Sequence, residues 1–208
     1  MPERVQKGQG TMRAFTFENA TKIYFGGGCV KEHLLEAVKP YGETVMLAYG
    51  GGSIKKNGVY EEVIAALEKA GKTIIEFPGI MENPTYKKVL EGTKLVKEKQ
   101  VDWILAVGGG SVMDCSKAIS MAAVSEKDVW DEYWAKKGVV DFEPMPLGVI
   151  VTASGTGSEC NGGAVITNEE VMIKTDRDYP KCNPEFALMD PTYTYTVPTK
   201  QMVAGSFD

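Results

Sequence analysis

The sequence has a single histidine, His33, and four cysteines (Cys29, Cys115, Cys160 and Cys182), none of them in C-x-x-C spacing. Catalytic zinc sites use several His, Cys or carboxylate ligands, and redox pairs commonly use C-x-x-C, so this composition argues against both within the chain itself. His33 follows Lys31 and Glu32 at the start of an expected helix, which predicts a surface position and offers no Ser-His-Asp relay. We expect the four thiols to be free, as in a reducing cytoplasm.

Long apolar runs and an excess of positive charge are also missing. No run approaches the ~20 residues that span a membrane, and residues 1–11 are polar and lack the apolar core of a signal peptide. The net charge of −5 leaves no basic stripe to neutralise phosphates. We therefore expect a cytoplasmic protein that binds neither nucleic acid nor membrane, with residues 1–11 a tail and Met12 an alternative start.

Short apolar runs alternate with helical patterns over residues 12–198. Alternation of this length predicts an α/β domain with a Rossmann-like parallel sheet, flanked on both faces by helices. The expected strands are residues 21–25, 44–49, 73–77, 103–107, 146–152, 164–167 and 186–189, and the expected helices are residues 30–38, 59–70, 85–99 and 113–124. A charged turn is expected at residues 168–170.

Three of these strands end in Gly-Gly-Gly, at residues 26–28, 50–52 and 108–110. The sequence Gly108-Gly109-Gly110-Ser111 lies between a strand and a helix, where glycines let the backbone approach a pyrophosphate at the helix N-terminus. Ser111 and Asp114 have the spacing of an S-x-x-D capping box. The G-x-G-x-x-G fingerprint is absent, and a tight capped turn without a ligand explains this motif equally well when it is taken alone.

Two further motifs fall at the same expected edge of the sheet. The turn from Gly50 to Lys56 carries glycines, Ser53 and two lysines where dinucleotide folds place an acidic residue on the ribose 2′-hydroxyl, so it would accept a 2′-phosphate. The segment from Thr152 to Glu159 carries small hydroxyl residues and glycines that could surround an adenosine or a phosphate. A loop with solvated lysines and a helix-capping turn are the respective alternatives. Three such turns at one edge favour a single nucleotide site.

The order and spacing of these motifs resemble the iron-containing (group III) alcohol dehydrogenase family, in particular its NADPH-dependent butanol dehydrogenase branch. The resemblance runs from about Phe15 to Asp208. It rests on the segments at residues 25–28, 49–56, 83–85, 108–114, 155–159 and 188–191. It implies the N-terminal domain of an iron-dependent alcohol dehydrogenase / dehydroquinate synthase-like fold, with NADP(H) as its cofactor.

The resemblance also implies roles for individual residues. The diphosphate would lie on the loop at residues 108–111, the adenosine ribose would face residues 51–53, and Asn83 and Asp114 would lie toward the nicotinamide. The full set of implied cofactor-binding residues is Gly51, Gly52, Ser53, Asn83, Gly108, Gly109, Gly110, Ser111, Asp114, Thr152, Thr156, Val165, Lys174 and Leu188.

The family's metal site is implied only in part. Gly205-Ser206-Phe207-Asp208 resembles the start of its Gly-x-x-Asp-x-x-x-His segment, so Asp208 would be one ligand of a divalent metal, Fe²⁺ or Zn²⁺, whose other ligands are three histidines. We expect residues 199–208 to begin a helical metal-binding domain that this sequence lacks, with Thr199 as N-cap. The chain would then hold no catalytic residue of its own, bind cofactor, and be inactive alone.

The intact enzyme would transfer hydride between nicotinamide and a primary alcohol or aldehyde such as butanol or butanal. In the family, a strand such as residues 13–24 pairs across a homodimer. The aromatic stretch at residues 128–137 is expected to pack in the core rather than contact substrate. A non-catalytic nucleotide-binding module and a glycerol dehydrogenase-like or dehydroquinate synthase-like relative remain as alternatives.

Overall fold

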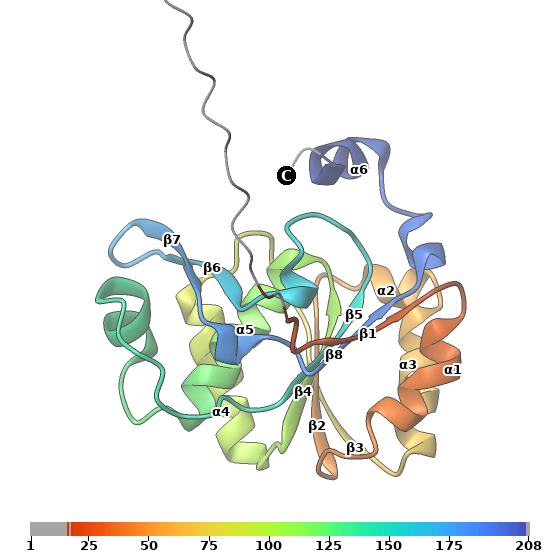
Figure 1. Ribbon diagram of the computed structural model, residues 1–208, viewed down its shortest axis with the longest axis horizontal. Helices are drawn as coiled ribbons and strands as arrows, with labels where there is room; N and C mark the ends of the chain where they lie inside the picture. The colour runs from red at the N-terminus through yellow and green to blue at the C-terminus, as the bar shows by residue number, and fades with distance from the viewer. Residues whose placement is uncertain (1–15, 17, 207–208) are drawn as a thin grey trace, which may run out of the picture.

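A computed structural model describes residue 16 and residues 18–206. Its centre is a parallel sheet of six strands in the order β1-β8-β5-β4-β2-β3 (Figure 1). The strands are β1 (Lys22–Phe25), β2 (Thr44–Tyr49), β3 (Thr73–Phe77), β4 (Trp103–Gly108), β5 (Leu147–Val151) and β8 (Phe186–Met189). The expected α/β fold with a parallel sheet is confirmed.

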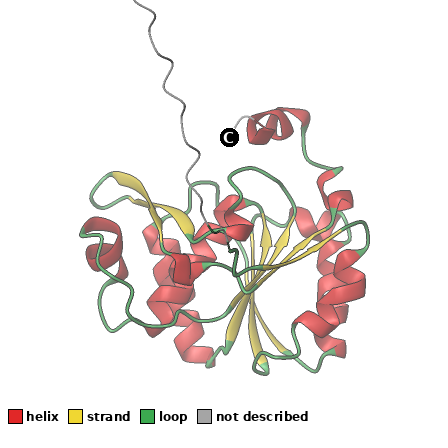
Figure 2. Cartoon of the chain, viewed as in Figure 1, coloured by secondary structure: helices red, strands yellow, loops and turns green. Residues whose placement is uncertain are grey.

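Helices cover both faces of the sheet, as the cartoon shows (Figure 2). Successive residues of a strand point to opposite faces, and in β2 Val45 and Leu47 join one core cluster while Met46 and Ala48 join the other. The first cluster lies under α1 (Cys29–Ala37) and α3 (Val59–Lys69), and the second under α4 (Tyr86–Lys99) and α5 (Gly110–Val124). Burial on both faces explains why β2 and β4 read as continuous apolar runs.

The start of α5 differs from the expectation. The helix begins at Gly110, three residues earlier than predicted, and no side chain caps it. The capping box of Ser111 and Asp114 is therefore wrong. The Asp114 carboxylate instead accepts hydrogen bonds from the Ser158 hydroxyl (2.7 Å) and the Val165 amide (3.0 Å). These tertiary donors satisfy the carboxylate in place of the helix's own first-turn amides.

A small antiparallel hairpin follows β5. It consists of β6 (Gly163–Asn168) and β7 (Ile173–Asp178) and forms a separate two-stranded sheet. The sequence pattern predicted β6 and a charged turn but not β7, which is mostly exposed and carries four charged residues in six. The hairpin is anchored to the loop before α4, because the Thr167 amide donates to the Pro84 carbonyl at 3.0 Å.

The first strand is shorter than expected. Among the described residues β1 begins at Lys22 and pairs in parallel with β8, while residues 18–20 are not strand; residues 13–15 and 17 lie outside the described residues. The aromatic stretch contains a short π-helix, Trp130–Ala135, whose Trp130, Tyr133 and Trp134 are buried in the core. The packing role predicted for that stretch is confirmed.

The remaining elements are short. They are α2 (Ser53–Lys56), α6 (Thr199–Ser206) and 3₁₀ turns at Ser158–Cys160, Pro180–Cys182 and Pro191–Thr194. All four cysteines are free. His33 is partly exposed and stacks on the ring of Tyr24 with 4.9 Å between centroids. Among the described residues, no helix combines the length and apolar composition needed to cross a membrane.

Candidate cofactor site

Two of the three glycine corners line one cavity. Because β2 and β4 are adjacent and parallel, the corners at Gly50–Gly52 and Gly108–Gly110 lie side by side at the carboxyl edge of the sheet. They line a cavity of about 660 Å³. Ligands of open α/β sheets bind at this edge, and the volume is in the ordinary range for a small-molecule site.

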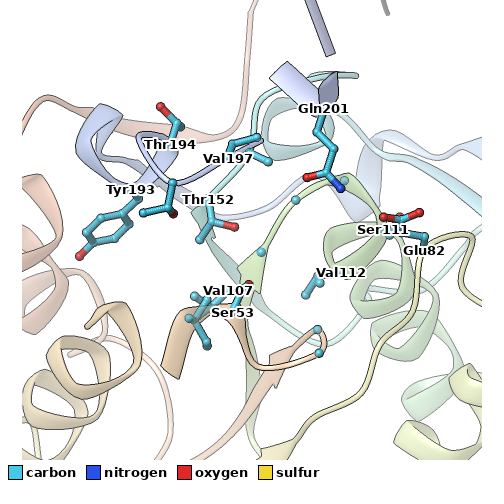
Figure 3. Close-up of a pocket in the computed structure, with 18 of the residues that line it drawn as sticks. Ser53, Glu82, Val107, Ser111, Val112, Thr152, Tyr193, Thr194, Val197 and Gln201 are labelled. Atoms are coloured by element: carbon cyan, nitrogen blue, oxygen red, sulfur yellow. The ribbon is translucent and has the colours of Figure 1, made fainter. Parts of the chain in front are cut away.

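The cavity is bounded by segments far apart in the sequence (Figure 3). Ser53 and Val107 lie at its base, Ser111 and Glu82 on one side, and Tyr193 on the other. Val197 and, in α6, Gln201 lie at its top. The lining residues are Gly50–Ile54, Asn57, Ile80–Asn83, Val107–Val112, Thr152–Ser154, Tyr193, Thr194, Thr196–Pro198, Gln201, Met202 and Ala204.

The N-terminus of α5 contributes an anion-binding surface. The first amides of a helix have no intrahelical acceptors, and no side chain caps this 15-residue helix. A Cβ at Gly109 would come within 3.4 Å of the Ala153 Cβ, and one at Gly110 within 3.3 Å of the Thr156 hydroxyl oxygen. The distance at Gly110 is short for a Cβ and that at Gly109 is an ordinary van der Waals contact, so the two loops lie against each other here. Among the described residues that line the cavity, Glu82 alone is charged, so a phosphate there would be bound through backbone amides, hydroxyls and the helix dipole.

The corner after β2 is open and polar. Gly52 has φ +94°, a left-handed conformation that favours glycine, and a Cβ at Gly51 would meet nothing within 4 Å. Ser53 is exposed and lines the cavity. The next lysine, Lys55, does not line it; its ammonium lies 3.2 Å from the Glu76 carboxylate.

The third corner has a different role. Gly26–Gly28 follows β1 at the edge of the sheet and is not among the residues lining the cavity. The Gly28 amide donates to the Asp190 carboxylate at 2.6 Å, and Asp190 also accepts from the Thr192 amide and hydroxyl. Burial alone would raise the pKa of Asp190, but these hydrogen bonds lower it below its usual value. This corner ties β1 to the turn after β8.

Nine of the fourteen expected cofactor-binding residues line the cavity. They are Gly51, Gly52, Ser53, Asn83, Gly108, Gly109, Gly110, Ser111 and Thr152. Two of the other five lie close to it: exposed Thr156 is near Gly110, and exposed Lys174 donates to the Asn83 side-chain oxygen at 2.5 Å. Asn83 itself has φ +53°, a strained conformation for a residue other than glycine. The contact joins β7 to the loop at the mouth of the cavity.

The remaining three residues do not line the cavity. Leu188 is fully buried in the core cluster beneath α1 and α3. Asp114 is buried on α5, and half-buried Val165 binds it through its amide. Burial raises the pKa of Asp114 above its usual value, against the effect of its hydrogen bonds and of nearby Lys117.

Lys117 completes a buried polar cluster behind the cavity. Its ammonium is fully buried and donates to the Ser158 hydroxyl (2.8 Å), the Gly163 carbonyl (2.8 Å) and the Asn161 side-chain oxygen (3.3 Å). Desolvation lowers the pKa of Lys117 to about 8, although Asp114 opposes the shift. Since Ser158 also donates to Asp114, the cluster joins α5, the loop after β5 and β6.

One wall of the cavity was not predicted from the sequence. It follows the last strand of the sheet and consists of Tyr193, Thr194, Thr196–Pro198, Gln201, Met202 and Ala204. The Asp190-Pro191 pair signals a turn, and Asp190 does cap the 3₁₀ turn that follows. No local sequence pattern indicates that the chain then returns across the carboxyl edge of the sheet, so this wall could not be predicted.

The metal site expected from the resemblance cannot be built from the described residues. Within residues 16 and 18–206, no three His, Cys, Asp or Glu side chains cluster as a metal site requires. The one histidine is engaged with Tyr24. Asp208, the expected ligand, lies outside the described residues.

Comparison with known proteins agrees with this geometry. A family model described as iron-containing alcohol dehydrogenase matches residues 20–191. The chain belongs to the iron-containing alcohol dehydrogenase family. It is 45% identical to a probable NADH-dependent butanol dehydrogenase of Bacillus subtilis and 38% identical to the NADPH-dependent aldehyde reductase YqhD of Escherichia coli, covering 95% of this chain and 50% of each relative.

A solved structure shares the fold. The NADH-dependent butanol dehydrogenase A of Thermotoga maritima superposes with a TM-score of 0.88 at 38% identity, over 95% of this chain and 49% of that one. The chain thus spans about half the length of the curated relatives it matches. These relatives include both an NADH-dependent and an NADPH-dependent enzyme.

Proposed function

We propose that this chain binds NADP(H) in the cavity at the carboxyl edge of the sheet. The diphosphate lies on the amides at the N-terminus of α5, and the adenosine ribose lies against Gly51–Ser53. The uncapped helix start beside two close-packed glycines carries the proposal, because it offers unpaired donors to an anion in a cavity otherwise poor in charge.

The preference for NADP(H) rests on the corner after β2. A carboxylate that accepts the ribose 2′-hydroxyl would repel a 2′-phosphate, and this corner carries glycines and the hydroxyl of Ser53 instead. The space around Gly51 is open. Both features suit the larger, more highly charged cofactor.

We propose further that the chain is the cofactor-binding part of an NADP(H)-dependent alcohol dehydrogenase, acting on a primary alcohol or aldehyde such as butanol or butanal. Its family membership supports this reaction class. The metal, Fe²⁺ or Zn²⁺, would need Asp208 together with donors outside the described residues. The chain alone therefore binds and orients the cofactor without turnover. A cytoplasmic homodimer that pairs through the N-terminal strand is part of the same proposal.

Calorimetric titration of the 208-residue chain with NADP⁺ and NAD⁺ tests the proposal. We expect both nucleotides to bind, NADP⁺ more tightly, and Gly109→Val to weaken both at least about tenfold because its side chain crowds the loop at Ala153. Gly27→Val is the matched control, since Gly27 lies in the corner outside the cavity and a Cβ there has only a 3.8 Å contact. A wild-type chain that binds neither nucleotide at millimolar concentration contradicts the proposal.

A further inference from the structure

A charged cluster lies directly behind the corner after β2. The Glu76 carboxylate on β3 receives hydrogen bonds from the hydroxyls of Tyr49, at the end of β2, and Tyr60, on α3 (2.7 Å for Tyr60). The Lys55 ammonium, on α2, lies 3.2 Å from the same carboxylate. It also lies over the ring of Tyr60 at 4.2 Å from the centroid and near that of Tyr49 at 5.2 Å.

These contacts fix where the ammonium of Lys55 lies. A lysine on a solvent-exposed helix is normally free to move through many rotamers, whereas here a carboxylate and two aromatic rings contact its ammonium, and none of these residues lines the cavity. Hydrogen bonds from Tyr49 and Tyr60 lower the pKa of Glu76, so the carboxylate is ionised at neutral pH and compensates the lysine charge.

Ser53, which lines the cavity, is two residues before Lys55 on the same short helix. The long flexible stem of a lysine would let a released ammonium turn toward a group bound at Ser53. We propose that Glu76 is a specificity-determining residue, which withholds Lys55 from a phosphate on the adenosine ribose and so limits the preference for NADP(H) over NAD(H). This inference rests on the proposed placement of the cofactor and deepens it.

The contact with Glu76 alters the interpretation of Lys55 and Lys56 as a binding site for a 2′-phosphate. Lys55 and Lys56 together suggest a doubly positive corner for a 2′-phosphate, yet one of the two charges is already neutralised by Glu76. Discrimination between the cofactors then depends on the Ser53 hydroxyl and the backbone of the corner after β2. It is accordingly weaker than the sequence suggests.

The test is the ratio of NAD⁺ to NADP⁺ dissociation constants, measured by calorimetry at low ionic strength on the 208-residue chain. Glu76→Gln keeps an oxygen acceptor for one tyrosine hydroxyl, places an amide NH₂ at the other and removes the charge that pairs with Lys55. We therefore expect NADP⁺ to bind about three- to fivefold more tightly with NAD⁺ affinity unchanged. Lys55→Met in the wild-type background should leave the ratio unchanged within about twofold. The double variant Glu76→Gln/Lys55→Met should bind NADP⁺ no more tightly than the wild type does.

Glu61→Gln is the matched control, since Glu61 is an exposed carboxylate at the start of α3 and its loss changes the net charge equally. Equal tightening of both nucleotides in Glu76→Gln, or the same gain in Glu61→Gln, overturns the inference. A selective loss of NADP⁺ affinity in Lys55→Met also overturns it. The unchanged NAD⁺ affinity shows that the variants are folded. If the wild type binds neither nucleotide, the proposed function fails as well, whereas an unchanged ratio with both bound refutes this inference alone.

Discussion

Lys117 allows the buried cluster behind the cavity to be tested by pH. Its ammonium is fully buried on α5 and donates to three acceptors, and Asp114, Asp178, Glu159 and Cys182 act on its charge. Desolvation is the largest effect and lowers its pKa from 10.5 to about 8. Between these two values the unfolded chain holds a proton that the folded chain has released, so folding stability should rise with pH in that window.

The magnitude follows from that window. Each pH unit within it is worth about 1.4 kcal/mol for one proton, so the wild type should gain about 2 kcal/mol relative to Lys117→Met between about pH 7.5 and about pH 9.5. At the lower pH the variant should already be less stable by about 2–3 kcal/mol, because three acceptors lose their donor.

Urea unfolding of both proteins at the two pH values measures this difference, with Lys97→Met, at an exposed position on α4, as the control for loss of one lysine charge. The control should show a small difference that does not rise with pH. If the advantage of the wild type over Lys117→Met stays constant or falls as the pH rises, Lys117 is not buried and desolvated as described.

Three further substitutions test the corner after β1, the ribose site and the packing of β5 on β8. Asp190→Asn should destabilise the fold by about 1.5–3 kcal/mol at neutral pH, since Gly28 and Thr192 donate hydrogen bonds to the carboxylate. Because folding lowers the pKa of Asp190, the stability advantage of the wild type in urea unfolding should shrink as the pH falls through that pKa. An advantage that persists in acid would contradict this. Gly51→Asp adds a carboxylate in open space, where it would repel a phosphate on the adenosine ribose. Calorimetry should show NADP⁺ affinity falling about tenfold and NAD⁺ affinity changing less. Equal losses would argue against a ribose phosphate at this corner. Gly148→Ala would place a Cβ within 2.5 Å of the Phe186 ring, so thermal unfolding should show a loss of about 1–3 kcal/mol, and an unchanged midpoint would mean that β5 and β8 pack less closely than described.

Much of the sheet follows from the sequence alone. The strands at residues 44–49, 73–77 and 186–189 were predicted to the residue, because each is a short apolar run bounded by charged residues, glycine or proline. Since all six strands are parallel, their carboxyl ends share one edge, and the neighbouring glycine corners after β2 and β4 could be placed together. That placement predicted the floor of the cavity.

The remaining features depend on contacts between distant segments. β7 is too charged to be read as a strand and is defined by its pairing with β6. Asp114 has the spacing of a helix cap, but its partner Ser158 is 44 residues away. Likewise the compensation of Lys55 by Glu76 arises because α2 lies beside the end of β3. None of these partners has a local signal in the sequence.

We propose that a nicotinamide dinucleotide lies across the two adjacent glycine corners. Amide chemical-shift mapping of the ¹⁵N-labelled chain titrated with NADP⁺ tests it most directly. We expect the largest shifts at Gly51–Ser53 and Gly109–Ser111, with Gly26–Gly28 unaffected. Saturating NADP⁺ that leaves both lining corners unshifted, or that shifts only Gly26–Gly28, would contradict the claim.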